Sequence, residues 1–485
     1  MMKKTFALIL LAAFAISTAV ALSPKWLDII LRQKEESAFI VRSIPSDSVA
    51  TIQHIPGTKA LFDSLEVTVV DSGKRYTYPL DSIARCELRR HIPVINIVTD
   101  SAVYDVTSKE KYLDGIFSMT EGAGVDTDYE AVKPVKVKVR GRGNSTWMLP
   151  KKPYRLKFDK KISICGLKKA KNYVLIANYI DPTLLHNAAA FEIASRLGMP
   201  WTNHSIPVDV YFNGRYCGAY MLSEKVGINA GSVDIDEDTG LLLEMDEAMD
   251  ENYCYKSPLL QLPIMIKDPD IDEIAEKDTT LTAAAIFDSI KAEFNTAEAS
   301  LLVADKDAWR NYFDLESAVN YVLIQNVTGN WDFTHPKSLY VWREKKGDKF
   351  KFGPVWDFDW TADYYVNHGF ELDYGYPLLT SNDSSADMFR YMTRTEAFWD
   401  FYRAQWEKYK NHIWPEVKAY LLAYTDLIET SAYTNGELWH PNRADRHRYY
   451  WKPTTMLRKS VEDYITWLER RMEYIDQSPS MGLYW

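Results

Sequence analysis

The sequence predicts an α+β protein built from three successive parts. Up to about residue 90, short alternating runs of apolar and polar residues are separated by Ser, Asp and Gly turn signals, a pattern typical of small β-strands. Residues 91–280 contain strand-length apolar runs and one clearly amphipathic helix. From residue 281 onward the chain is rich in aromatic residues and in helical patterns. A hydrophobic content of 46% over 485 residues is sufficient for a sizeable core.

Residues 1–21 have the features of a secretory signal peptide. Lys3 and Lys4 form a basic start, an apolar run spans 6–15, and Ala19-Val20-Ala21 fits a small-x-small cleavage site. No other stretch approaches the ~20 uninterrupted apolar residues of a membrane-spanning helix. We therefore expect a bacterial protein that is exported, periplasmic or extracellular at the cell surface, with no integral membrane span after signal cleavage.

Charge and cysteine content exclude some classes of function. The formal net charge of −10 argues against nucleic acid as the main partner. Four cysteines, Cys86, Cys165, Cys217 and Cys254, are few for an exported chain of this length, and their spacings match no zinc motif. One or two disulfides and four buried thiols are both compatible with this count.

The front segment, residues 22–90, is expected to form a small β-rich module. Its alternating runs at 65–70 and 75–79 predict two strands, because successive side chains of a strand point to opposite faces.

The middle part, residues 91–280, is expected to be a β/α unit. Asp181-Pro182 and Gly198 predict the start and the end of a helix over 183–197. The predicted strands are 91–98, 135–140, 154–158, 173–177, 208–212 and 219–222.

A polar turn joins two of these strands. The strand 135–140 runs into Gly141-Arg142-Gly143-Asn144-Ser145-Thr146, and the following strand carries alternating cations from Lys151 to Phe158. Backbone N–H groups, hydroxyls and cations can converge on an anion in such a turn, which would suit a triphosphate. The glycine spacing matches neither a Walker loop nor a dinucleotide fingerprint. A solvated hairpin tip is the alternative interpretation.

Two aspartates follow aromatic or apolar runs in the helix-rich part. Asp332 ends Gly329-Asn330-Trp331-Asp332, and Asp357 lies 25 positions later in Val355-Trp356-Asp357-Phe358-Asp359. A short hairpin would bring both carboxylates to one cleft. Kinase-like enzymes use one aspartate to orient the attacking hydroxyl and a second, a short hairpin later, to hold magnesium. Trp-Asp pairs also end strands and cap helices, so the pattern depends on support from other motifs.

Together these segments resemble the spore-coat-protein-H (CotH) kinase family. The resemblance runs in order from about residue 91 to 475 and leaves residues 22–90 outside. The motifs that carry it are Arg142–Trp147, Lys151–Phe158, Asn172–Asn178, Asn213–Tyr220 and Trp356–Asp359.

The resemblance implies a two-lobed atypical protein-kinase-like fold behind a small N-terminal β-rich module. The expected parts are a signal peptide (1–21), the β-rich module (22–90), a nucleotide-binding N-lobe (91–280) and a helix-rich C-lobe with the catalytic and metal aspartates (281–485).

The implied activity is that of a secreted protein kinase that moves the γ-phosphoryl group of ATP to Ser or Thr of an unidentified protein partner, with Mg²⁺ or Mn²⁺. By position, Asp332 corresponds to the catalytic aspartate. Asp357 corresponds to the metal ligand, and Asp359 is its nearby support. The turn residues Arg142, Asn144, Ser145 and Thr146 correspond to the phosphate-covering loop.

Other residues of the nucleotide site are less specifically indicated. Lys152 and Lys157 are the candidates for contacting the α- and β-phosphates, and the sequence does not distinguish between them. Glu224, at a strand end, would supply hinge backbone for adenine. Glu192 would orient the lysine, or is simply solvated. Trp147 and Trp356 are candidates for stacking on the base.

The chain departs from the kinase pattern at Lys337. Five positions after the catalytic aspartate, kinases have an asparagine that binds a second metal, and a charged lysine cannot ligate magnesium. Four interpretations are open. Either one metal suffices, or another carboxylate such as Asp359 compensates, or Lys337 neutralises phosphate in the metal's place, or the protein binds nucleotide without transferring phosphate.

Two other functions are compatible with parts of the pattern. Paired carboxylates in an exported, aromatic-rich chain also fit a glycosidase, but Thr361 stands where the general acid of an Asp-x-Asp-x-Glu motif is needed. A non-catalytic surface or adhesion scaffold that retains the fold is the second alternative. It is supported by Lys337 and by the scarcity of ATP outside the cytoplasm.

Overall fold

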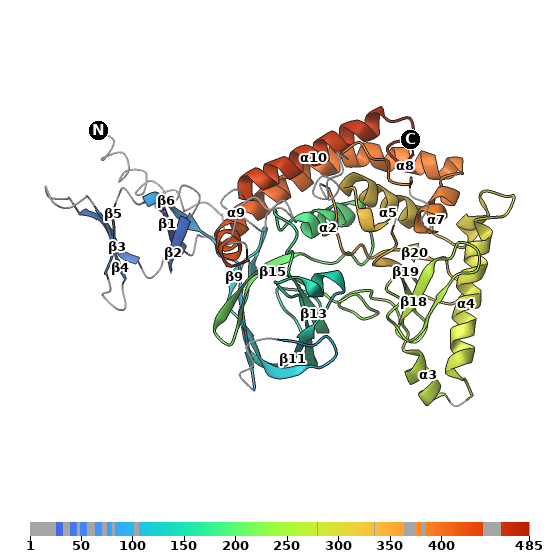
Figure 1. Cartoon of the computed structure of the whole chain (residues 1–485), viewed down its shortest axis with the longest axis horizontal. Coiled ribbons are helices and arrows are strands. Elements are labelled where there is room, and N and C mark those ends of the chain that lie inside the picture. Colours follow the sequence, from blue (N-terminus) through green and yellow to red (C-terminus); the bar gives the residue numbers. More distant parts are fainter. Residues whose placement is uncertain are drawn as a thin grey trace.

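A closed β-barrel, a second sheet and a group of long helices make up most of the molecule (Figure 1). The structure is a computed structural model. The residues it describes are 26–32, 39–45, 49–55, 64–69, 75–79, 83–100, 106–278, 280–333, 335–362, 374–380, 384–439 and 457–484. The predicted signal peptide lies outside them. The α+β class predicted from the sequence is confirmed.

Two three-stranded antiparallel sheets precede the barrel and lie to one side of it in Figure 1. Their orders are β2-β1-β6 and β3-β4-β5. The two strands predicted in this segment are confirmed as β4 and β5. The bounds are β1 Trp26–Arg32, β2 Phe39–Pro45, β3 Val49–Ile55, β4 Ser64–Val69, β5 Arg75–Pro79 and β6 Ile83–Arg89.

Seven strands close into a barrel in the order β11-β12-β13-β15-β14-β7-β8. Neighbours are antiparallel except β14 and β7, which run parallel. The bounds are β7 Val94–Thr99, β8 Leu113–Met119, β11 Val132–Gly141, β12 Tyr154–Ile162, β13 Ala170–Ile176, β14 Ile206–Phe212 and β15 Arg215–Glu224. The sequence predicted all of these strands except β8, whose Asp114 and Gly115 are unfavourable in a strand.

Side-chain alternation gives the barrel two apolar faces. Along β13, Tyr173 and Leu175 pack in the barrel interior, whereas Val174 and Ile176 belong to the larger core outside it. The outer face of β13 and its neighbours therefore contacts the rest of the protein.

Helix α2 (His186–Leu197) packs against this outer face. It begins three residues later than predicted because Asp181 holds the preceding turn. The Asp181 carboxylate accepts hydrogen bonds from the backbone N–H of Thr183 at 2.8 Å and of His186 at 2.7 Å. Gly198 ends the helix in the left-handed conformation (φ 82°), as the sequence predicted.

A five-stranded antiparallel sheet follows, in the order β17-β18-β16-β19-β20. It combines three strands from the predicted N-lobe segment with two from the helix-rich segment. The sequence did not predict it, because β16 and β19 are buried at every position and so lack alternation. The bounds are β16 Leu241–Met245, β17 Cys254–Lys256, β18 Pro263–Asp268, β19 Leu339–Arg343 and β20 Lys351–Phe352.

The helices that cover the sheet and one side of the barrel come mostly from the second half of the chain (Figure 1). Helix α9 packs on β15 and on α10. The bounds are α3 Ile271–Lys277, α4 Ala283–Ser300, α5 Leu315–Thr328, α7 Ser384–Met392, α8 Glu396–Lys408, α9 Trp414–Trp439 and α10 Leu457–Gln477. Within the described ranges, no helix is both long and apolar enough to cross a membrane. Cys165, Cys217 and Cys254 are free thiols.

Candidate active site

A cavity of about 880 Å³ lies between the outer face of the barrel and the five-stranded sheet. Its barrel wall includes Arg155 on β12 and Ile176 on β13, and its sheet wall includes Glu244 on β16 and Tyr340 on β19. The glycine-containing turn and all three aspartates singled out from the sequence line it. Its volume is in the range of small-molecule sites.

The turn after β11 packs through its glycines. A Cβ on Gly141 would lie 2.3 Å from the Trp147 ring, and one on Gly143, whose φ is +83°, would lie 2.3 Å from Thr146 Oγ1. Neither position accepts a side chain without local rearrangement. The turn is also held by Lys109, another residue that lines the cavity, whose ammonium donates to the Gly143 carbonyl at 3.0 Å.

The four predicted phosphate-loop residues, Arg142, Asn144, Ser145 and Thr146, all line the cavity. The Arg142 guanidinium lies 5.6 Å from the centre of the Trp356 ring, next to Asp357, whose charged form it favours. Trp356 lines the cavity, whereas Trp147 packs beside the turn and is not among the lining residues.

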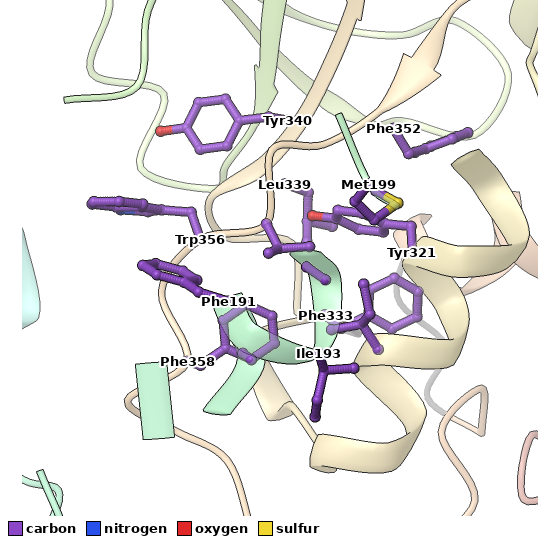
Figure 2. Close-up of a cluster of buried hydrophobic side chains, with 14 of the residues drawn as sticks. Phe191, Ile193, Met199, Tyr321, Phe333, Leu339, Tyr340, Phe352, Trp356 and Phe358 are labelled. Atoms are coloured by element: carbon purple, nitrogen blue, oxygen red, sulfur yellow. The ribbon is translucent and has the colours of Figure 1, made fainter. Parts of the chain in front are cut away.

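Aromatic neighbours fix the aspartates in the core. Phe333 and Phe358 are fully buried. Phe333 follows Asp332 in the sequence, and Phe358 lies between Asp357 and Asp359. Phe333 packs on Phe389 with ring centres 4.8 Å apart, and Trp356 stacks on Phe191 of α2 at 5.8 Å. Figure 2 shows this buried cluster, in which side chains of α2, α5 and β19 meet the two aspartate segments. Burial of these rings leaves the backbone at each aspartate little freedom.

Asp332 lies just beyond the end of α5. Gly329 ends that helix in the left-handed conformation, and the Asn330 side chain then accepts a hydrogen bond from the Asp332 backbone N–H at 3.2 Å. The Asp332 side chain is 5% exposed and lines the cavity. It is therefore a desolvated carboxyl group facing the space between the two walls.

Asp357 and Asp359 are held by α2. The Asn187 side chain accepts a hydrogen bond from the Phe358 backbone N–H at 2.9 Å and donates one to the Asp359 carboxylate. Asp357 adopts a left-handed backbone conformation, φ 63°, which is uncommon for a residue other than glycine. Sequence reasoning missed Asn187, because nothing local links it to a segment more than 170 positions away.

The carboxyl groups of the site disfavour one another's ionised forms. Burial and the charge of Asp357 raise the pKa of Asp332 well above its usual range. Burial raises the pKa of Asp357, while Arg142 and Lys337 oppose that rise. Burial and the charge of Asp357 raise the pKa of Asp359 to about 8. Positive charge brought between them would stabilise the carboxylates.

The donor set fits a hard divalent cation. Carboxylate oxygens are the ligands that Mg²⁺ prefers, and it is commonly held by one or two of them together with substrate phosphates and water. Among the described residues, no three His, Cys, Asp or Glu side chains are close enough to hold a metal by themselves. Asp357 and Asp359 therefore fit a metal whose remaining ligands come from phosphate and water.

The predicted lysines lie outside the cavity lining. The Lys152 ammonium donates to the Trp147 carbonyl at 2.7 Å, so it stabilises the turn and does not face the cavity. Lys157 is exposed and lies 5.9 Å from the Tyr112 ring. Lys151, which sequence reasoning passed over, lines the cavity instead.

Lys151 is buried at the edge of the barrel, with 1% of its surface exposed. Its ammonium donates to the carbonyls of Ala177, at 2.7 Å, and of Ala219, and lies 4.5 Å from the Tyr220 ring. Burial lowers the pKa of Lys151 to about 7, although Asp209 favours the charged form.

Two predicted glutamates also point elsewhere. Glu224 is buried against His204, whose Nδ1 lies 2.6 Å from the Glu224 carboxylate. The next two residues, Lys225 and Val226, do line the cavity. Glu192 on α2 pairs with Arg196 at 2.6 Å.

Lys337 faces the cavity together with the aspartates. It is half-buried, and its backbone N–H donates to the Asp332 carbonyl at 3.3 Å. The departure noted from the sequence thus stands inside the candidate site.

Residues 139–475 match the family described as CotH kinase protein. No curated protein matches the chain.

Proposed function

The chain belongs to the CotH kinase family, and we propose that it transfers the γ-phosphoryl group of ATP to a serine or threonine hydroxyl of a protein partner. The observation that carries this proposal is the meeting of the glycine turn and the two aspartate segments at one cavity. Phosphoryl transfer depends mainly on positioning and on neutralising charge, and this cavity offers groups for both.

In this proposal Asp332 acts on the acceptor. Its carboxylate orients the attacking hydroxyl and accepts its proton as the new P–O bond forms, while the bond between the γ-phosphorus and the β–γ bridging oxygen breaks and ADP leaves. Burial raises the pKa of the Asp332 carboxyl group, and a raised pKa makes its carboxylate a stronger base.

Asp357 and Asp359 hold Mg²⁺ or Mn²⁺ in this proposal. A metal held there would supply positive charge that offsets the negative charge developing on the phosphates during transfer. Asn187 serves as a positioning residue, because it fixes both the Phe358 backbone and the Asp359 carboxylate.

The nucleotide phosphates are proposed to lie against the glycine turn. Arg142 is the main cation, and Asn144, Ser145 and Thr146 supply hydrogen-bond donors from a rigid loop. Lys151 takes the role that the sequence suggested for Lys152 or Lys157, since it faces the cavity and they do not, and a bound phosphate would favour its charged form. The backbone at Lys225 and Val226, next to Glu224, is the proposed contact for adenine.

We also propose the lobes and location that the family resemblance implies. The barrel then corresponds to the N-lobe and the helix-rich part to the C-lobe, behind the β-rich module of residues 22–90. Residues 1–21 direct export, and the partner is an exported protein.

A non-catalytic scaffold is the second candidate, because Lys337 replaces the asparagine of the kinase pattern. The glycosidase alternative has less support. Thr361, where its general acid would stand, is buried and donates its hydroxyl hydrogen to the Phe358 carbonyl at 2.9 Å.

The test is transfer of label from γ-³²P-ATP by the mature protein with Mn²⁺ or Mg²⁺. Dephosphorylated casein, an extract of exported proteins and the chain itself serve as acceptors. We expect label on Ser or Thr with the wild type and none with Asp332→Ala. Nucleotide binding without label in any acceptor would contradict the proposal and favour the scaffold.

A further inference from the structure

Hydrogen bonds to two other segments fix the backbone around Lys337. The Lys337 N–H donates to the Asp332 carbonyl at 3.3 Å, and the preceding Pro336 carbonyl accepts from the Glu247 N–H at 2.9 Å. The following Ser338 N–H donates to the Asp246 carboxylate at 3.2 Å. These contacts tie the segment to the Asp332 turn and to the chain just after β16. The backbone of Lys337 is therefore fixed between the Asp332 turn and the chain after β16.

The side chain of Lys337 acts on both key carboxylates. Lys337, Asp332 and Asp357 line the same cavity. Lys337 is a cation that faces the cavity shared by both aspartates, from the side of the Asp332 turn.

We propose that Lys337 replaces a second divalent cation, so that this site binds one metal ion with each nucleotide. The inference rests on the proposed function. It concerns this chain in particular, because it depends on the residue that departs from the kinase pattern.

Two physical arguments support the replacement. An ammonium group has three donors and no lone pair, so it cannot ligate a metal, and its charge disfavours a cation nearby. The same group donates well to a phosphate oxygen, and such charge-assisted hydrogen bonds are short and strong. Lys337 thus supplies, as a permanent part of the chain, positive charge that the second metal supplies in other kinases.

Two other carboxylates that line the cavity, Asp246 and Glu244, already have hydrogen-bond or ion-pair partners. Asp246 accepts hydrogen bonds from the N–H groups of Ala248, at 2.7 Å, and Ser338. Glu244 pairs with Lys267 at 3.0 Å. A second ion beside Lys337 would have to compete with these existing contacts.

The test counts Mn²⁺ ions. The mature protein is saturated with β,γ-methylene-ATP, and bound Mn²⁺ is measured by electron paramagnetic resonance and by calorimetry. We expect one Mn²⁺ per nucleotide in the wild type and in the control Lys349→Asn, an exposed lysine. Lys337→Asn, which restores an oxygen ligand, is expected to bind two.

Lys337→Ala separates charge from ligation. It is expected to keep one Mn²⁺ and to bind the analogue about tenfold more weakly, the loss typical of one charge-assisted hydrogen bond. Two Mn²⁺ ions in the wild type, or one in Lys337→Asn, would overturn the inference while leaving the proposed function in place. Absence of analogue binding by a folded wild type would instead refute the proposed function.

Discussion

Replacing Lys151 by methionine tests the electrostatics of the barrel edge. Lys151 is 1% exposed, and burial lowers its pKa from 10.5 to about 7. Between these two pH values the folded protein holds a neutral amine at this position, whereas the unfolded chain still binds the proton. The stability of the wild type therefore rises with pH in this window and falls as the pH drops toward 7.

The magnitude follows from the size of the shift. One bound proton of difference is worth about 1.4 kcal/mol per pH unit. From pH 7 to 9.5 the wild type should gain about 3 kcal/mol relative to Lys151→Met, which lacks the titrating group. The destabilisation that comes from burying protonated Lys151 is fully present below the pKa of the folded state and absent above pH 10.5.

The assay is urea unfolding of both proteins at pH 7, 8, 9 and 9.5. We expect the difference in the free energy of unfolding between wild type and Lys151→Met to grow in favour of the wild type as the pH rises. Lys152→Met, which removes a half-buried lysine at the next position, is the matched control and should follow the wild type. A wild-type minus Lys151→Met difference that does not change with pH would refute the view that this ammonium is desolvated.

Three substitutions test the site itself. Asn187→Leu removes the hydrogen bond to the Asp359 carboxylate. We expect a loss of about 1–3 kcal/mol in stability, measured by urea unfolding, and weaker Mn²⁺ binding, measured by calorimetry. Unchanged metal binding would contradict the positioning role. Gly143→Ala forces a Cβ against Thr146 at a positive φ, so ATP affinity measured by calorimetry should fall, and an unchanged affinity would contradict the phosphate-loop role. Asp332→Asn should retain ATP binding but lower the transfer rate about 10²–10⁴-fold in the γ-³²P assay; a rate near that of the wild type would exclude Asp332 as the acceptor base.

The sequence predicted most barrel strands because their side chains alternate between an interior and an outer core. It did not predict β16 and β19, whose positions are all buried and whose apolar runs show no period. The end of α2 was predictable because glycine at a helix end has a local cause. Its start was not, since Asp181 shifts it through hydrogen bonds to the next turn.

At the candidate site, sequence proximity was informative for the aspartates and misleading for the lysines. Asp332 and Asp357 lie next to buried aromatic residues, so their direction is fixed locally. The choice between Lys151 and Lys152 depends on the carbonyl groups of Ala177, just after β13, and of Ala219 on β15, which are distant in sequence. Glu224 turns toward His204, a contact that no local pattern indicates.

The most direct test of the central claim is calorimetric binding of ATP with Mg²⁺ or Mn²⁺ to the mature protein. Asp357→Ala is compared with the wild type, and Asp288→Ala, an exposed aspartate on α4, is the control. We predict metal-dependent ATP binding by the wild type and the control and its loss in Asp357→Ala. No ATP binding by a well-folded wild type, or equal binding by Asp357→Ala, would contradict a nucleotide and metal site in this cavity.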